Sequence, residues 1–505
     1  MTAPQLSYPE ALAALESRGR FGIHLGLSRT RALLARLDHP ERTFRGALIA
    51  GTNGKGSVLA LMGSALTAAG YNVGETPKPH LVTYRERLQI GGRPVDPDTF
   101  AKLASRVLAE ADRVARRHGE PTEFELLTAI TFLWFAEVGI DLAVVEVGLG
   151  GRLDATHAWD GGVAVVTNVS LDHMDRLGST VELIAKEKAA IIMRGDLAVT
   201  GAWGSALEVI ERRSRRVAAP LSVTPPAPLR AVDRDGIQVE LGRLGLVRVG
   251  LRGRHQAANV AVADAALDAL ETAGIARVSG EWRRAGYASV KWPGRLELLE
   301  VGSGAEAARP GGTTGSGAAR PPAAAAESAR PGGTSGSGAA ARPGGTSGSG
   351  AAPLSRGARE VLLDGAHNPA GAQTLAEALD EMAPFLRPGR PTLVLAIMAD
   401  KDVDGVIGAL SRATLSRAAR VICTAPAGGR AMPADLLAAR WQALAGRAAE
   451  AVTEPAAALD AALGTGDGPI IVAGSLYLVG AARAILVTDP LLVPDPPLPH
   501  PESVP

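Results

Sequence analysis

A glycine-rich loop is the first segment whose residue types could do chemistry. Gly-Thr-Asn-Gly-Lys-Gly-Ser occupies residues 51–57, after an apolar run at 47–50 and before a helix expected at 58–69. Strand, glycine loop and helix in this order direct backbone N–H groups at phosphate oxygens. Lys55 can neutralise β and γ phosphates, and the Ser57 hydroxyl can bind Mg²⁺. The loop is shorter than the ordinary Walker form, and a tight turn without a ligand is the alternative.

Two further residues follow expected strands and suit the binding of a cation. Glu146 lies near the end of an apolar run at 141–147, and His173 comes after a second run at 163–168. Ligands of open α/β sheets gather at the carboxyl ends of the strands, where a carboxylate suits Mg²⁺. A capping role for Glu146 and a structural role for His173 are the alternatives that the residue types leave open.

The elements that must position these residues alternate between strand-like and helix-like runs. This alternation predicts mostly parallel sheets covered by helices. Asp235-Gly236 between alternating apolar residues predicts a hairpin within a small antiparallel insertion at 229–251, and a helix follows at 256–272. The expected strands are 47–50, 141–147, 163–168 and 197–200, then 296–301, 361–363, 392–397, 420–424 and 469–473.

We therefore expect an α/β protein with two domains. Residues 1–294 are expected to form a P-loop ATPase-like domain with a mostly parallel sheet, and residues 295–488 a smaller, Rossmann-like α/β domain. Residues 302–353 repeat an Ala-Arg-Pro-Gly-Gly-Thr phrase without any aromatic or large aliphatic residue, so we expect a disordered insertion. The proline-rich stretch 489–505 is expected to be a disordered tail.

The overall composition is that of a soluble globular enzyme. The net charge of +1 gives no support for a nucleic acid or an anionic membrane as a partner. The sequence shows neither a signal peptide nor an uninterrupted apolar span. Cys423 is the one cysteine, which excludes an intramolecular disulfide and fits a reducing cytoplasm. We expect a cytoplasmic monomer.

Many segments, in a fixed order, resemble the dihydrofolate synthase/folylpolyglutamate synthase family, which is related to the Mur peptide ligases. The resemblance covers nearly the whole chain except the repeat and the tail. It implies a ligase that uses ATP and Mg²⁺ to join L-glutamate to dihydropteroate, to reduced folates or to both. The matching segments are 51–57, 79–81, 85–87, 122–125, 146–156, 171–173, 187–189, 253–256, 292–295, 364–369 and 474–477.

The resemblance also implies roles for individual residues. Lys188 matches a lysine that is often carbamylated in the family, and two Mg²⁺ ions are expected. The implied catalytic residues are Lys55, Glu146, His173 and Lys188, and the implied metal ligands are Ser57, Glu146 and His173. The implied ATP-binding residues are Gly51, Thr52, Asn53, Gly54, Lys55, Gly56, Ser57, Gln256, Asn259, Arg295, Asp364 and His367. The implied substrate-binding residues are Thr122, Phe124, Glu125 and Asp154 for the pterin, with Lys401, Ser475 and Tyr477 for glutamate.

One position departs from the family pattern. Lys78 stands before Pro79-His80-Leu81, where the family has a serine that binds the second metal. A charged lysine cannot bind Mg²⁺. The ammonium could lie against phosphate, or Thr76 could be displaced toward the site. Our hypothesis is that Lys78 points away and that the other ligands and water retain the metal.

Two other functions are compatible with parts of the sequence. A Mur-type ligase acting on a different carboxylate shares the loop, but its uridine-binding domain would have to precede residue 51. A P-loop switch protein would not need the second domain that carries Asp364 and His367. ADP release that depends on glutamate and on a folate-type acceptor separates these alternatives.

Overall fold

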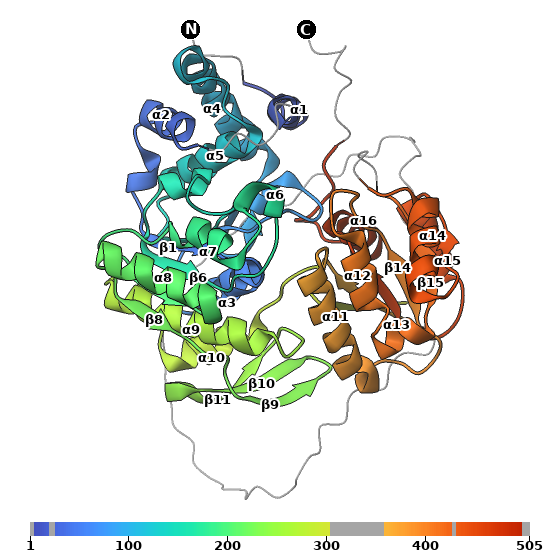
Figure 1. The fold of residues 1–505 in the computed structure, drawn as a ribbon. Coiled ribbons are helices and arrows are strands. Elements are labelled where there is room, and N and C mark those ends of the chain that lie inside the picture. The colour runs from blue at the N-terminus through green and yellow to red at the C-terminus, as the bar shows by residue number, and fades with distance from the viewer. Residues whose placement is uncertain (1–4, 20–25, 303–357, 427–430, 497–505) are drawn as a thin grey trace, which may run out of the picture. The chain divides into compact units, whose positions relative to one another are not determined.

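Two mostly parallel sheets organise the chain (Figure 1). The computed structural model describes residues 5–19, 26–302, 358–426 and 431–496. The described parts of 1–301 and 359–505 form one compact unit. The expected repeat insertion at 302–353 lies, apart from Gly302, outside the described residues.

The first sheet has eight strands in the order β4-β3-β2-β5-β1-β6-β7-β8. The six strands from β2 to β8 are parallel, and the two short edge strands β3 and β4 are antiparallel. Every residue of β1 and β5 is buried, as a parallel sheet covered on both faces requires. The strands are β1 Gly46–Ala50, β2 Val73–Thr76, β3 Gln89–Ile90, β4 Arg93–Pro94, β5 Leu142–Glu146, β6 Gly162–Val166, β7 Leu197–Thr200 and β8 Leu221–Val223.

Helices cover both faces of this sheet because alternate strand residues point to opposite sides. Leu48 and Val145 pack into one core with α1, α2, α4, α5, α7 and α8, whereas Ile49 and Val144 pack into another with α3, α9 and α10. The first group is α1 Tyr8–Gly19, α2 Ser28–Arg36, α4 Pro97–His118, α5 Glu123–Val138, α7 Val181–Ala189 and α8 Gly204–Val217. The second group is α3 Lys55–Ala68, α9 Gln256–Thr272 and α10 Gly280–Ser289, and a short α6 spans Met174–Leu177.

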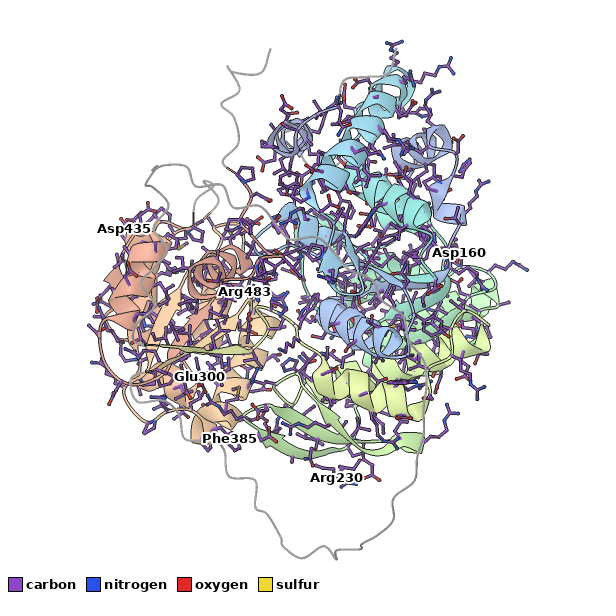
Figure 2. All side chains as sticks on the ribbon, turned by 180° about the vertical axis from the view of Figure 1, so that it is seen from behind. Asp160, Arg230, Glu300, Phe385, Asp435 and Arg483 are labelled. Atoms are coloured by element: carbon purple, nitrogen blue, oxygen red, sulfur yellow. The ribbon has the colours of Figure 1, made fainter. Side chains whose placement is uncertain are left out.

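The predicted antiparallel insertion is confirmed as a three-stranded sheet, β11-β10-β9. It consists of β9 Leu229–Asp233, β10 Gly236–Leu241 and β11 Gly245–Val249. Arg234, in the turn between β9 and β10, donates hydrogen bonds of 2.6 Å to Glu300 and Glu360. It also donates to the carbonyl oxygen of Phe385; Figure 2 labels Glu300 and Phe385. The hairpin is thereby tied to the second sheet.

The second sheet has six strands in the order β12-β13-β17-β14-β15-β16, with β12 antiparallel to β13 and the others parallel. The strands are β12 Glu297–Val301, β13 Arg359–Asp364, β14 Thr392–Leu395, β15 Arg420–Cys423, β16 Glu450–Ala451 and β17 Ile470–Ala473. The helices are α11 Pro369–Met382, α12 Val403–Leu410, α13 Thr414–Ala418, α14 Ala434–Ala445, α15 Pro455–Leu463 and α16 Leu476–Leu486. None of the described helices is both long and apolar enough to cross a membrane.

The predicted α/β class is confirmed, while the expected tail is partly wrong. Residues 489–496 are not an unstructured tail, because Asp495 accepts hydrogen bonds from Tyr8, Thr83 and Tyr84. Residues 497–505 lie outside the described residues. The domain boundary at 294/295 stays a prediction.

Deleting residues 302–353 should leave the fold and the ATP turnover nearly unchanged. Val301 of β12 pairs directly with Arg359 of β13, so the remaining residues 354–358 would close an ordinary hairpin. The two proteins should unfold at nearly the same temperature, since loop length costs little stability. Their rates of glutamate-dependent ADP release should agree to within about twofold. A folded deletion variant with a large loss of kcat would show that the insertion has a function.

Candidate active site

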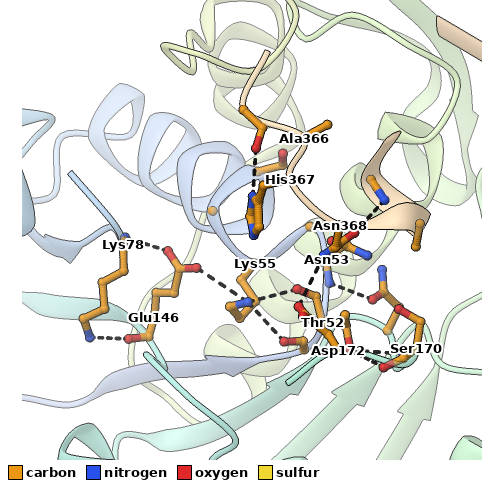
Figure 3. A pocket seen from close by; sticks show the side chains of 18 of the residues that line it. Thr52, Asn53, Lys55, Lys78, Glu146, Ser170, Asp172, Ala366, His367 and Asn368 are labelled. Carbon is orange, nitrogen blue, oxygen red and sulfur yellow. Dashed lines mark hydrogen bonds and ion pairs between the residues drawn. The ribbon is translucent and has the colours of Figure 1, made fainter. Parts of the chain in front are cut away.

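A cavity of about 770 Å³ lies where loops from both sheets meet (Figure 3). Sixteen of the residues expected from the sequence line it: Gly51, Thr52, Asn53, Gly54, Lys55, Gly56, Ser57, Phe124, Glu146, His173, Lys188, Gln256, Asn259, Arg295, Asp364 and His367. All of the expected nucleotide-binding and metal-binding residues are thus brought together, although they come from elements far apart in the sequence.

The glycine loop joins β1 to α3 and is fixed by the neighbouring strand end. The backbone N–H groups of Thr52 and Asn53 donate to the backbone and side-chain oxygens of Asn168, both at 2.9 Å. The Thr167 hydroxyl donates to the carbonyl of Asn53 at 2.7 Å. These bonds hold the loop at the N-terminus of α3, where unpaired backbone N–H groups favour an anion.

Two glycines of the loop are required by close neighbours. Gly54 has a φ of 82°, and a Cβ atom there would lie 2.3 Å from Oδ1 of Asn259. A Cβ atom at Gly56 would lie 2.6 Å from the ring of Trp292. Any larger residue would therefore displace the loop from α9 or from the segment that leads into the second sheet.

Lys55 is the cation of the loop. Its ammonium donates to the carbonyl oxygens of Gly51 and Thr52, both at 3.1 Å, and lies 4.0 Å from Oε1 of Glu146. The side chain is thus folded back over its own loop, within reach of any phosphate bound there.

Glu146 ends β5 and is a buried carboxylate between two cations. The backbone N–H of Lys78 donates to its Oε2 at 2.9 Å, and Lys55 faces its Oε1. Burial raises the pKa of Glu146, and Lys55 is the largest opposing influence.

Lys78 occupies the opposite side of Glu146 from Lys55 (Figure 3). Its ammonium donates to the backbone carbonyl of Glu146 at 2.5 Å and lies 4.7 Å from the centre of the Phe124 ring, a cation–π contact. Burial lowers the pKa of Lys78 to about 8. The charge therefore points away from the glycine loop and toward Phe124.

Asp172 and His173 follow β6. His173 has a left-handed backbone with a φ of 49°, and its Nε2 lies 3.9 Å from Oδ1 of Asp172. Burial lowers the pKa of His173, which favours the neutral form of its ring. The Asn368 amide donates to Asp172 at 3.3 Å, which connects this loop to the second sheet.

Lys188 on α7 is buried and donates to the Gly51 carbonyl at 2.8 Å. Burial, and then the charge of Lys55, lower the pKa of Lys188 to about 7. Much of this side chain is therefore a neutral amine near pH 7, which is the form that reacts with carbon dioxide.

The second sheet contributes Arg295, Asp364 and His367 to the cavity. Asp364 accepts backbone hydrogen bonds from Leu296 and Ala366, each at 2.9 Å, and so fixes the segment next to Arg295. A Cβ atom at Gly365 would lie 2.3 Å from Nη1 of Arg295, so a larger residue there would require the guanidinium to move. Burial lowers the pKa of His367 to about 4, which keeps its ring neutral.

Three expected pterin residues do not line the cavity. Thr122 and Glu125 form a capping box at the start of α5, and Glu125 also pairs with Arg29 at 2.9 Å. Asp154 caps the short 3-10 helix 155–158 and accepts from Leu149 N–H and from Thr156. These carboxylates are already engaged within the protein, and Phe124 alone of the expected pterin group reaches the cavity.

The three expected glutamate-side residues also lie outside the cavity lining. Ser475 is buried and caps α16, whereas Tyr477 is half-exposed. Leu476, between them, does line the cavity. Burial raises the pKa of Asp172, but the charges of His173 and then of Lys401 lower it, and the net shift is downward. Lys401 therefore lies near the cavity.

Several lining residues were not expected from the sequence. Asn168 and Ser170 follow β6, and Trp203 follows β7. Their positions after the carboxyl ends of these strands could have indicated that they line a ligand site. Arg87 and Asn368 belong to motifs that the family shares, but nothing in their local pattern marked them as site residues.

The donor set fits a hard cation with many water ligands. Ser57, Glu146 and His173 line the same cavity, and Oε1 of Glu146 accepts no hydrogen bond from the described residues. No group of three or more His, Cys, Asp or Glu side chains in the described ranges is arranged to enclose a metal. A magnesium ion here would keep several waters, as it commonly does beside phosphates.

Comparison with known proteins places this geometry in a family. Residues 49–201 match the Mur ligase middle domain, and residues 354–476 match the Mur ligase glutamate ligase domain. The chain is 32% identical to the dihydrofolate synthase/folylpolyglutamate synthase of Mycobacterium tuberculosis over 503 residues, which cover 92% of this chain and 90% of that protein.

Solved structures agree with the sequence match. Folylpolyglutamate synthase of Mycobacterium tuberculosis complexed with ADP and AMPPCP superposes with a TM-score of 0.76 at 29% identity, covering 96% of this chain and 100% of that one. The bifunctional enzyme of Yersinia pestis complexed with AMPPNP and a Mn ion gives a TM-score of 0.71 at 25% identity, covering 95% and 98%. The chain belongs to the dihydrofolate synthase/folylpolyglutamate synthase family of ATP-dependent glutamate ligases.

Proposed function

We propose that this protein uses ATP to join L-glutamate both to dihydropteroate and to reduced folates. The observation that carries the proposal is the convergence of Lys55, Glu146 and Arg295 from both sheets on one cavity. A cavity of about 770 Å³ has room for a nucleotide and part of a second substrate. The two activities occur together in the name of the relative from Mycobacterium tuberculosis.

The proposed reaction passes through an acyl phosphate. The carboxylate of the acceptor attacks the γ phosphate of ATP, which releases ADP. The amine of glutamate then attacks the acyl carbon, and inorganic phosphate leaves as the amide forms. Two negatively charged groups must approach each other in the first step, so Lys55 and Arg295 would screen their repulsion. Because the acyl phosphate reacts with water, the site must be closed during turnover.

Ser57 would hold one divalent cation beside the phosphates, and Glu146 and His173 would hold a second one. A bound magnesium ion supplies positive charge that offsets the charge developing on the transferred phosphoryl group. Glu146 would position this charge beside Lys55, to which its Oε1 is already close at 4.0 Å. Gln256 and Asn259, joined by a hydrogen bond of 2.8 Å, would bind the nucleotide on the α9 side of the loop.

The acceptor is proposed to lie on the Lys78 side of Glu146. Phe124 offers a ring for stacking, and Arg87 also lines the cavity there. Arg87 is held by its hydrogen bond to His80 at 2.9 Å, so its guanidinium is preorganised for an anionic acceptor.

Carbamylation of Lys188 is part of the proposal. The lowered pKa supports it, because the uncharged amine is the reacting form. A carbamate would keep the N–H that donates to Gly51 and would place a negative charge near the loop, where it could help to hold the metal. Action as a monomer in the cytoplasm is also proposed.

A Mur-type ligase with another carboxylate acceptor is the remaining alternative. The match to the Mur ligase domains is shared by both functions. The similarity to the folate enzyme over 92% of this chain favours the folate acceptor. Assays with dihydropteroate and with tetrahydrofolate, each with and without glutamate, would decide between the two functions. If neither acceptor supported glutamate-dependent ADP release, the proposal would be contradicted.

Replacing Lys55 with alanine should abolish glutamate-dependent ATP turnover and leave the fold intact. The loop would lose the cation beside the phosphates, and we expect a fall in kcat of about 100-fold or more. Lys186→Ala is the matched control, because this lysine is exposed on α7 and lies outside the cavity lining. Near-normal turnover of a folded Lys55→Ala protein would overturn the phosphate-loop assignment.

Replacing Lys78 with serine should lower the magnesium concentration needed for half-maximal rate, with little change in kcat. The change removes a positive charge that acts on the Glu146 carboxylate through space, and it supplies a hydroxyl that can bind metal. Lys78→Met separates the two effects, because it removes the charge without adding a hydroxyl. A higher magnesium requirement or a collapse of kcat in Lys78→Ser would mean that the ammonium itself acts on the phosphates.

Removing carbon dioxide from the buffer should reduce activity if Lys188 is carbamylated. The neutral fraction of Lys188 rises as the pH passes upward through about 7, so added bicarbonate should restore more activity at pH 8 than at pH 6. Lys188→Ala should be insensitive to bicarbonate. Equal rates with and without carbon dioxide in the unmodified protein would argue against the carbamate.

A further inference from the structure

The segment after α16 crosses to the first sheet and is held there by specific bonds. We call residues 489–495 the strap. Oδ1 of Asp495 accepts from the hydroxyls of Tyr8 at 2.5 Å and Thr83 at 2.6 Å, and its Oδ2 accepts from Tyr84 N–H at 2.8 Å. The carbonyl of Leu491 accepts from Arg85 at 3.1 Å. Burial and then the bond to Asp495 raise the pKa of Tyr8, so its hydroxyl remains a donor.

These bonds hold the turn that positions the acceptor side of the cavity. Thr83 and Tyr84 begin the short 3-10 helix η2, Tyr84–Arg87, in which Thr83 forms a capping box with Glu86. Glu86 in turn accepts from the backbone N–H groups of Leu81 and Val82, at 3.1 and 2.7 Å. Residues 81–87 of the loop 78–87 are therefore one hydrogen-bonded unit, to which the strap is bonded.

Both ends of this loop reach the main cavity. Lys78 and Arg87 line it, together with Phe124 of α5. The strap itself lines a second cavity of about 600 Å³ through Asp489, Leu491 and Leu492. Lys78, Pro79, Arg295 and Leu476 line both cavities.

We propose that the strap is a positioning element of the acceptor site, which fixes loop 78–87 and walls the cavity beside it. This inference rests on the proposed function. A segment that only covered apolar surface would have no need of a carboxylate that accepts three hydrogen bonds from two separate segments. Such bonds to a charged group are short and directional, so they fix geometry as well as stability.

The test compares Asp495→Ala with a protein that ends at residue 496. The shortened protein keeps every strap contact described above and should behave like the full chain. Asp495→Ala should raise the KM for the acceptor about five- to tenfold, with the KM for ATP unchanged and kcat altered less than about twofold. An acceptor KM equal to that of the full chain would overturn the proposal. Equal fold-increases in the KM values for acceptor and ATP would overturn it as well.

Hydrogen exchange gives a readout that does not depend on turnover. Backbone amides of residues 81–87 should exchange faster in Asp495→Ala than in the full chain, while those of α9 should not change. Tyr8→Phe removes one of the three donors and provides a milder variant if Asp495→Ala does not fold. It should shift the acceptor KM in the same direction by a smaller factor, and unchanged exchange and KM in a folded Tyr8→Phe protein would count against the strap.

The same experiments separate this inference from the proposed function. If the unmodified chain failed to release ADP with any folate-type acceptor and glutamate, the proposed function would fail. The exchange comparison would still report whether the strap holds loop 78–87. If turnover is normal but exchange in the loop is unaffected by Asp495→Ala, only the inference fails.

Discussion

A carboxylate buried at the end of a strand needs positive charge or hydrogen bonds close by, and Glu146 meets this need with Lys55 on one side and Lys78 on the other. Lys55 belongs to the loop after β1, and Lys78 follows β2, on the opposite side of β5 in the sheet. The charge balance of one residue thus depends on the relative placement of three neighbouring parallel strands. The proposed nucleotide and acceptor regions lie on the two sides of this carboxylate.

Much of the fold could be predicted from local patterns. The run from β1 through the glycine loop to α3, the hairpin at Asp235-Gly236 and the helix Gln256–Thr272 follow from short-range signals that the tertiary structure respects. The strand β2, Val73–Thr76, was missed because it contains a glycine and the buried Glu75 in only four residues. Its place in the sheet depends on pairing with β5, which lies about seventy residues later in the sequence.

The site residues show the same division. Residues that follow strand ends, such as Glu146 and Lys55, reach the cavity because parallel strands bring their carboxyl ends together. Asp154 and Glu125 cap short-range backbone N–H groups in the structure, and their binding of substrate stays a prediction. The order of the strap could not be anticipated either. Its composition favours disorder, whereas a single aspartate finds partners about four hundred residues away.

The side chains shared by the two cavities have a thermodynamic consequence. Lys78, Arg295 and Leu476 line both cavities, so a ligand that moved one of these groups would change the lining of the other cavity as well. By linkage, any factor by which one ligand changes the affinity for the second must equal the factor in the reverse direction. Through the shared residues Lys78, Pro79, Arg295 and Leu476, a molecule bound in one cavity can change the free energy of binding in the other.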